Sequence, residues 1–405
     1  MTSETKEKED TRKNISSKQN HEKRSLLNYL LVSLAVLLSS ILIAILASKY
    51  EPVAFYTHQP LKFQGPLAAN NKLQNAELLL KDQQVIGPES LIVEGDVIYA
   101  AVEDGRILKV VNGKIVKEVI LVKDKECQTS GDRLKNPHKC GRPLGMRRLN
   151  KDLIVFADAY LGVVTVDVEK GEVKIILPGD TIVDGKPLRF ADDLDILDEN
   201  TVIISDASTK WYHNLVVYDF IEHNPNGRVI QVDLKTGEAK VLLDKLVFPN
   251  GIQLFPDKQS VLISETWEYR VTRLYIAGPK KGQHEVFVNL PGAPDNIRLN
   301  PRGNFWVAIA CTRQQGKFFI WDFLAPYPLI RTLIMQLVPE SYIGDFHLWL
   351  LQKYGLIVEV DQNGNFVSSL HDPTGEVREV SQIEEDEKYL YVASYHMPFI
   401  AKVKK

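Results

Sequence analysis

The chain has 405 residues, of which 44% are hydrophobic, and its formal net charge is −3. This is enough apolar material for a large core, while the weak net charge and the lack of a basic groove interleaved with aromatic residues argue against nucleic acid as a partner. Three cysteines are too few for a disulfide scaffold, and no CxxC spacing indicates a zinc site or a redox dithiol.

The N-terminal region combines a charged tail with one long apolar run. Residues 1 to 25 are rich in Lys, Glu and Ser and lack apolar periodicity, so they are expected to be disordered. Residues 26 to 47 carry no charge and are long enough to cross about 30 Å of hydrocarbon as a helix. The lipid bilayer is therefore the expected partner of residues 26 to 47.

The charges around the apolar run predict its orientation. Only Lys49 follows it closely, whereas several basic residues precede it: Arg12, Lys13, Lys18, Lys23 and Arg24. The positive-inside rule then places the N-terminus in the cytosol and everything after Ala47 in a lumen or outside the cell. This predicts a single-pass type II membrane protein of the cell surface or endoplasmic reticulum, with residues 48 to 75 as a stalk. The alternative, a cleaved signal peptide, would need a shorter apolar region.

Two of the cysteines bracket a polar loop. In the oxidising compartment that this topology implies, Cys127 and Cys140 are expected to form a disulfide, and the alternative is two free surface thiols. Closing a loop of that size stabilises the fold by about 3 kcal/mol in the chain-entropy model. Cys311 ends an apolar strand and is expected to be an inert buried thiol.

A β-strand pattern recurs from residue 76 to residue 405. Hydrophobic second strands begin near residues 97, 153, 202, 261, 305 and 389, and a recurrence of roughly 40 to 50 residues is typical of a propeller of four-stranded blades. The pattern predicts an all-β fold, a six-bladed β-propeller. Its last blade lacks a fourth strand, which the apolar segment at residues 76 to 80 can supply, closing the ring with an N-terminal strand.

Two insertions interrupt the pattern, at residues 211 to 226 and 313 to 353. Apolar residues in the second lie at near-helical spacing, which predicts two amphipathic helices. Because both insertions leave the same corner of neighbouring blades, they are expected to cover one face. Three roles stay open: a lid over a substrate pocket, padding of the propeller, or contact with the bilayer that the anchor keeps nearby.

The residues that open the innermost strands of a propeller meet at one mouth of its channel. Four of the six openings carry oxygen donors: Glu89, Asp192, Asn250, Asp295 and Asn296. Hard oxygen ligands without Cys or His favour Ca²⁺. The alternative is that each side chain caps a strand by hydrogen bonding to loop backbone. Clustered carboxylates without a cation would repel one another, which favours the metal.

Several motifs in the same order resemble the strictosidine-synthase-like family: CGRPLG at Cys140, ADAYLG at Ala157, SDASTKW at Ser205, GRVIQVD at Gly227, FPNG at Phe248 and PGAPDNIR at Pro291. The resemblance covers the chain from about Pro60 to its end. It implies a six-bladed propeller, a type II topology, kinship with calcium-dependent paraoxonases and gluconolactonases, and arylesterase activity. It also implies four metal ligands, Glu89, Asn250, Asp295 and Asn296. Asp192 departs from the family pattern, because it stands where relatives carry Asn.

Two departures from the resemblance bear on activity. Ser381 stands where true strictosidine synthases carry a catalytic Glu, so strictosidine synthase activity is not expected, and Leu144 stands where paraoxonases carry a His. No general base can be transferred, and the candidates are Asp158 and Glu265, which end second strands near the same mouth. The alternative role for both side chains is to accept hydrogen bonds from the backbone of neighbouring loops. The chain has no GxSxG motif, which argues against an α/β-hydrolase.

Together these features predict a membrane-anchored, calcium-dependent arylesterase-like hydrolase that acts on small aryl esters or lactones. In that mechanism Ca²⁺ polarises the ester carbonyl while a nearby carboxylate activates water. The alternative is a cell-surface binding or adhesion propeller in which the metal is only structural. The missing His and Glu favour this alternative.

Overall fold

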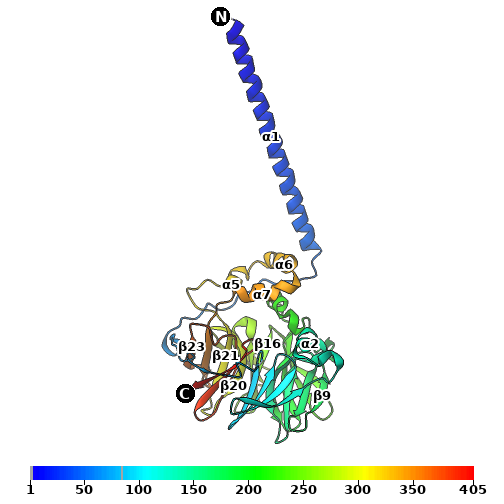
Figure 1. Ribbon diagram of the computed structural model, residues 1–405, viewed down its shortest axis with the longest axis vertical. Helices are drawn as coiled ribbons and strands as arrows, with labels where there is room; N and C mark the ends of the chain where they lie inside the picture. The colour runs from blue at the N-terminus through cyan, green and yellow to red at the C-terminus, as the bar shows by residue number, and fades with distance from the viewer. Residues whose placement is uncertain (1–2, 84) are drawn as a thin grey trace.

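The computed structural model describes residues 3–83 and 85–405. The body of the molecule is all-β, and one long helix projects from it (Figure 1). Within the described residues, six four-stranded antiparallel sheets make up this body. Their strands, in sheet order, are β2 (Ser90–Glu94), β3 (Val97–Val102), β4 (Arg106–Val111) and β5 (Lys114–Ile120); β6 (Pro143–Arg148), β7 (Leu153–Asp158), β8 (Gly162–Asp167) and β9 (Glu172–Pro178); β12 (Ala191–Asp198), β13 (Thr201–Asp206), β14 (Gly227–Asp233) and β15 (Ala239–Leu246); β16 (Pro249–Leu254), β17 (Ser260–Glu265), β18 (Arg270–Tyr275) and β19 (His284–Asn289); β20 (Gly292–Leu299), β21 (Phe305–Thr312), β22 (Gly355–Val360) and β23 (Phe366–Asp372); β24 (Val380–Glu385), β25 (Tyr389–Ser394), β26 (Ile400–Lys404) and β1 (Glu77–Leu79).

The sheets are arranged radially, as in a propeller. The first strands of successive sheets contact one another in the order β2, β6, β12, β16, β20 and β24, and β24 contacts β2 in turn. The predicted second strands are found as β3, β7, β13, β17, β21 and β25. β7 and β17 are buried along almost their whole length, because each sheet packs against a neighbour on both faces.

The two ends of the β-region share one sheet. β1 pairs antiparallel with β26, with Glu77 opposite Lys402 and Leu79 opposite Ile400. This pairing covers an edge of β26 that would otherwise present free backbone groups. A short separate hairpin is formed by β10 (Ile182–Val183) and β11 (Lys186–Pro187).

Helix α1 (Ser3–Leu46) is continuous, which contradicts the expected disorder of residues 1 to 25 from Ser3 onward. Residues 3 to 25 contain no Gly or Pro, and their Lys and Glu residues favour helix. The helix formed by the apolar run therefore continues through them. Within α1, Ser16–Leu46 is long and apolar enough to cross a membrane, and its apolar 18-residue window has a mean hydropathy of 2.7 and no residue buried in the protein.

The expected stalk at residues 48 to 75 is instead bound along the body. The Phe55 N–H donates to the Ala325 carbonyl at 3.3 Å, and Leu67 and Leu73 are buried. These apolar side chains gain from burial, so the segment does not stay extended in solvent. It contains a short helix, η1 (Gly65–Leu67), which contacts β23.

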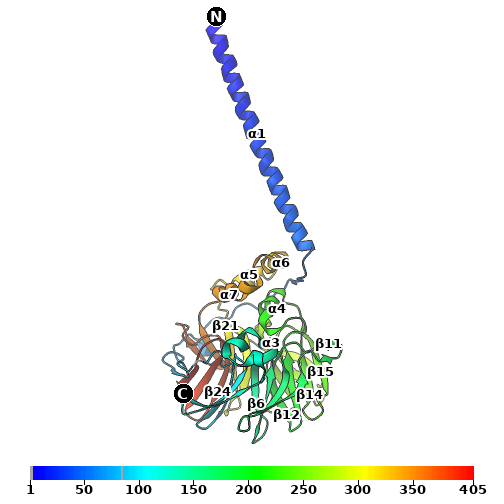
Figure 2. The same cartoon turned by 45° about the vertical axis from the view of Figure 1, so that its right-hand side comes forward.

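The insertions supply the helices that cover one face of the body. They form η3 (His213–Leu215) and α4 (Val216–Glu222), then α5 (Ile320–Leu324), α6 (Pro328–Leu337) and α7 (Glu340–Leu350). The second insertion thus holds three helices rather than the predicted two, because Pro328 starts a new helix after α5 and Pro339 separates α6 from α7. All of these lie on the side from which α1 projects (Figures 1 and 2).

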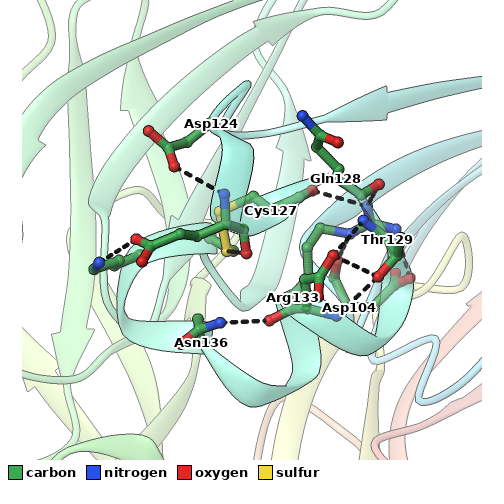
Figure 3. Close-up of a disulfide and its surroundings, with 11 residues drawn as sticks. Asp104, Asp124, Cys127, Gln128, Thr129, Arg133 and Asn136 are labelled. Carbon is green, nitrogen blue, oxygen red and sulfur yellow. Dashed lines mark hydrogen bonds and ion pairs between the residues drawn. A yellow bond between two sulfur atoms is a disulfide. The ribbon is translucent and has the colours of Figure 1, made fainter.

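The loop between β5 and β6 is closed by the predicted disulfide between Cys127 and Cys140 (Figure 3). It folds into η2 (Lys125–Cys127), α2 (Ser130–Lys135) and α3 (Pro137–Cys140). Arg133 is buried inside it and donates to the Asp104 carboxylate at 2.9 Å and to the Cys127 carbonyl at 3.1 Å. The alternative of two free thiols is therefore wrong.

Replacing both bridged residues, Cys127→Ser with Cys140→Ser, is expected to lower the free energy of unfolding by about 3 kcal/mol, since the unfolded chain regains the entropy of an open loop. Urea unfolding of the oxidised wild type and of the double variant measures the difference. Coincident unfolding curves would show that the bridge adds nothing.

Candidate functional site

A cavity of about 510 Å³ lies between the inner ends of the sheets and the covering helices. On the β side it is lined by four of the five predicted oxygen donors: Glu89, Asp192, Asn250 and Asp295. On the helical side it is lined by residues of α4 and α7: Val217, Phe220, Ile343 and His347. The insertions therefore form one wall of the pocket, which favours the lid over simple padding.

The predicted donors come together although they arise from different sheets. The Asn296 amide donates to Glu89 Oε1 at 2.7 Å across 207 residues of sequence. All five side chains are buried, and Ser381 Oγ fixes the backbone beside them by donating to the Glu89 carbonyl at 2.6 Å. Ser381, which stands where true strictosidine synthases carry a catalytic Glu, thus supports the loop that carries Glu89.

Irregular strand pairing aims these side chains at the cavity. The register between β16 and β17 shifts between Pro249 and Ile252, and that between β20 and β21 shifts between Pro294 and Ile297. A bulge of this kind re-aims side chains next to functional sites. The backbones also approach closely, since a Cβ at Gly251 would lie 2.6 Å from the carbonyl oxygen of Asp295.

The donor cluster contains oxygens that lack partners. Among the five donors of this cluster, three buried side-chain oxygens accept no hydrogen bond from the described residues: Glu89 Oε2, Asn250 Oδ1 and Asn296 Oδ1. Buried acceptors are normally satisfied, so each such atom calls for an explanation. No three His, Cys, Asp or Glu side chains in the described chain are close enough to hold a metal by themselves. A cation at this point would need the amide oxygens as well, which suits Ca²⁺.

The charges of the cluster point to the same need. Burial raises the pKa of Glu89 to about 7, with the nearby Asp193 charge adding to it. Burial, and then repulsion between their charges and that of Glu89, raises the pKa of Asp192 and of Asp295 well above the usual range. A bound cation would favour the ionised form of all three, so the residues present fit calcium.

An ion pair that the sequence did not reveal lies beside the donors. Arg298 donates to Asp193 through two bonds of 2.7 and 3.1 Å, and both side chains are buried. The same guanidinium donates to Gln382 at 2.9 Å, and Asp193 also accepts the Ile252 N–H at 2.8 Å. The sequence does place a charged residue within each of these inner strands, which could have indicated a buried ion pair. It gave no way to pair them, because Asp193 and Arg298 are 105 residues apart.

The two candidate bases are not brought to the cavity. Asp158 accepts the backbone N–H groups of Tyr160 and Leu161 at 2.9 and 2.8 Å, and burial raises its pKa. Glu265 accepts two bonds from Arg270, at 2.8 and 3.1 Å. Neither is among the described residues that line the cavity. Both act as anchors at the ends of second strands, which lie one strand outward from the centre.

Other residues that line the cavity were not expected there. Arg142 is 2% exposed, and its Nε has no acceptor among the described residues. Burial and the charge of Arg142 lower the pKa of His213 to about 3, so this imidazole is neutral. Leu144 also lines the cavity, and Cys311 is only partly buried there rather than fully, with a pKa that burial raises to about 12.

The stabilisation that calcium gives is expected to grow with pH. Because the pKa of Glu89 is raised to about 7, its protonated form contributes stability at low pH that is lost as the pH rises toward 7. A calcium ion held by these carboxylates would bind their ionised form, so the difference in Tm between calcium and chelator should be small near pH 5 and largest above about pH 7.5. A difference that is constant over this range would argue against carboxylate ligands.

Two family profiles match the chain. One described as "Strictosidine synthase" matches residues 192–279, and one described as "Strictosidine synthase-like, N-terminal" matches residues 65–110. The chain is also 38% identical over 377 residues to adipocyte plasma membrane-associated protein of Rattus norvegicus, covering 92% of this chain and 97% of that protein.

Solved structures of similar fold include a gluconolactonase from Xanthomonas campestris, with a TM-score of 0.52 and 15% identity over 88% of this chain and 98% of that one. The calcium-binding protein regucalcin from Agrobacterium tumefaciens has a TM-score of 0.51 and 13% identity, over 81% of this chain and 93% of that one. At these identities the likeness concerns the fold alone.

Proposed function

Because the chain belongs to the strictosidine-synthase-like family, together with adipocyte plasma membrane-associated protein, we propose that it is a membrane-anchored, calcium-dependent hydrolase of small aryl esters or lactones. The observation that carries this proposal is the cluster of buried donors with unpartnered oxygens beside the cavity under the covering helices. The metal ligands would be Glu89, Asp192, Asn250, Asp295 and Asn296.

The cavity wall suits an ester with an apolar body. When bound, Ca²⁺ supplies a Lewis acid for a carbonyl oxygen. The free Nε–H of Arg142 can donate to an oxygen on which negative charge develops. Aromatic side chains at the other side, Phe220, Phe248 and Trp267, offer an apolar surface for an aryl group and keep water away from it.

We also propose that the six sheets form a closed six-bladed propeller, with β1 completing the last blade. Residues 1 to 25 would lie in the cytosol, residues 26 to 47 in the bilayer, and residues 76 to 405 in a lumen or outside the cell. The disulfide supports this orientation, because such bonds persist in oxidising compartments. The name of the rat relative, which describes it as associated with the plasma membrane, supports membrane attachment.

A second function, a cell-surface binding or adhesion propeller with a structural metal, is favoured by one observation. Asp158 and Glu265 are absent from the described cavity lining, and Leu144 occupies part of it. No base suggested by the sequence is therefore positioned next to a bound ester.

Turnover of phenyl acetate and of a small lactone by the full chain in nanodiscs decides between the two. We expect turnover that a calcium chelator abolishes. In metal sites, removing a residue that hydrogen-bonds to a ligand already lowers activity by about 10- to 100-fold. Asn250→Ala removes a proposed ligand itself, so it should lower the turnover rate by at least about 100-fold. The surface variant Asn363→Ala should match the wild type. Chelation that lowers Tm in a protein without turnover above buffer would establish the binding module.

A further inference from the structure

The second insertion exposes an unusually apolar surface. Six large side chains of residues 318 to 349 are mostly in solvent: Phe318 (77% exposed), Phe323 (57%), Leu329 (58%), Leu337 (75%), Tyr342 (64%) and Trp349 (78%). Such a concentration of exposed large apolar side chains on one insertion indicates a site of interaction with a protein or a membrane. These six residues are called the helical patch below.

The helical patch lies next to the end of the candidate membrane span. Gln336 of α6 donates to the Ala44 carbonyl of α1 at 2.7 Å, and α6 contacts α1. The span ends at Leu46, two residues later, so this contact holds α6 at the boundary of the bilayer. Figures 1 and 2 both show α5, α6 and α7 between α1 and the β body.

The opposite side of the insertion is firmly packed on the body. Trp321, Met335 and Ile343 are buried in one cluster with residues of α4. Arg331 of α6 is 1% exposed and donates to the carbonyls of Ile221 and Ala325, the latter at 3.1 Å. The insertion therefore presents its apolar side chains as a fixed surface rather than as a loose segment.

We propose that the helical patch is immersed in the interfacial region of the membrane that α1 spans. An amphipathic helix binds in this way by burying its apolar face at the boundary between headgroups and acyl chains. The exposed side chains of the patch are apolar and aromatic, so zwitterionic lipid is sufficient and binding depends little on salt. The anchor and the helical patch together then hold the cavity beside the bilayer.

This position determines where the ligand of the cavity comes from. Helix α7 lines the cavity through Ile343, His347 and Leu348, and it also carries Tyr342 and Trp349 of the helical patch. Helix α7 thus has residues on both the cavity and the proposed membrane surface. The substrate class, which rests on the function proposed above and extends it beyond small esters, is an aryl ester or lactone whose apolar chain lets it partition into lipid.

Fluorescence quenching tests the immersion directly. The full chain, in phosphatidylcholine nanodiscs containing lipids with a nitroxide on the acyl chain, is labelled with an environment-sensitive dye in the variants Leu337→Cys and Trp349→Cys. The matched control is Val286→Cys on β19, which is 50% exposed, and the labelled parent protein serves as the blank. We expect quenching at least about threefold stronger at positions 337 and 349 than at 286.

Equal quenching at all three positions would overturn the immersion. A dimer in which two copies of the chain contact each other through positions 337 and 349 would overturn it as well. The helical patch would then be covered by a second copy rather than by lipid. The replaced side chains are exposed, so an unchanged Tm confirms that each variant is folded.

The substrate class is tested with Leu337→Ser combined with Trp349→Ser. Hydrolysis of a long-chain nitrophenyl ester in the nanodisc should fall about tenfold, while hydrolysis of water-soluble nitrophenyl acetate stays unchanged. An equal effect on both esters would refute supply from the membrane. If the wild type hydrolyses neither ester, the proposed hydrolase and its substrate class both fail, whereas the quenching result still decides the immersion.

Discussion

Arg298→Ala is expected to destabilise the protein by about 3 kcal/mol, because removing one partner of a buried ion pair leaves Asp193 with only the longer, 3.4 Å contact to Arg147 as compensation. Asp193 is fully buried and accepts two bonds from Arg298, so its carboxylate would lose its main countercharge. The pair also connects β20 to β12, which are the first strands of two different sheets. Urea unfolding of wild type and variant in the presence of calcium measures the loss.

The matched control for this prediction is an ion pair at the surface. Lys186 and Asp244 lie 3.0 Å apart, but their side chains are 42% and 38% exposed. Solvent screens such pairs, so Lys186→Ala should cost at most about 1 kcal/mol. Similar losses for the two variants would show that the central pair does not hold the inner strands together.

Glu89→Gln is expected to remove the stabilisation by calcium. A ligand at 100 times its Kd stabilises the folded state by about 2.7 kcal/mol, and the variant should lose this gain. The opposite change is expected in chelator near pH 8, where the neutral amide avoids the burial cost that raises the pKa of Glu89 to about 7. The variant should then be at least as stable as the wild type.

Tm values of wild type, Glu89→Gln and the surface variant Glu172→Gln, each with calcium and with chelator, check this crossover. Glu172→Gln should behave as the wild type does in both conditions, since its side chain is exposed at the start of β9. A variant at Glu89 that keeps the full response to calcium would remove this residue from the ligand set.

The sequence predicted the β-region well because strand spacing and burial repeat along it. The second strands are found where their apolar runs begin, and the segment near Glu77 pairs with the last strand. The donors could be grouped in advance because equivalent positions of a radial repeat lie near the same point of the axis. Asn296 and Glu89, far apart in sequence, are in hydrogen-bonding contact for that reason.

The sequence is less informative where the direction or the partners of a side chain depend on tertiary structure. A residue's position at the end of a second strand does not determine where its side chain points. Asp158 accepts from backbone N–H groups, and Glu265 accepts from Arg270. The pairing of Asp193 with Arg298 is non-local and has no sequence signature. Charge composition favours disorder near the N-terminus, but the apolar run of α1 continues as helix through this tail from Ser3.

The most direct test of the account is a calorimetric titration of calcium into the metal-free full-length protein in nanodiscs. The donors around Glu89, Asn250 and Asp295 predict saturable binding of about one ion per chain at neutral pH, which the Glu89 variant loses. A titration without binding heat, together with no retained calcium after dialysis against the free ion, would contradict the metal centre on which the account rests.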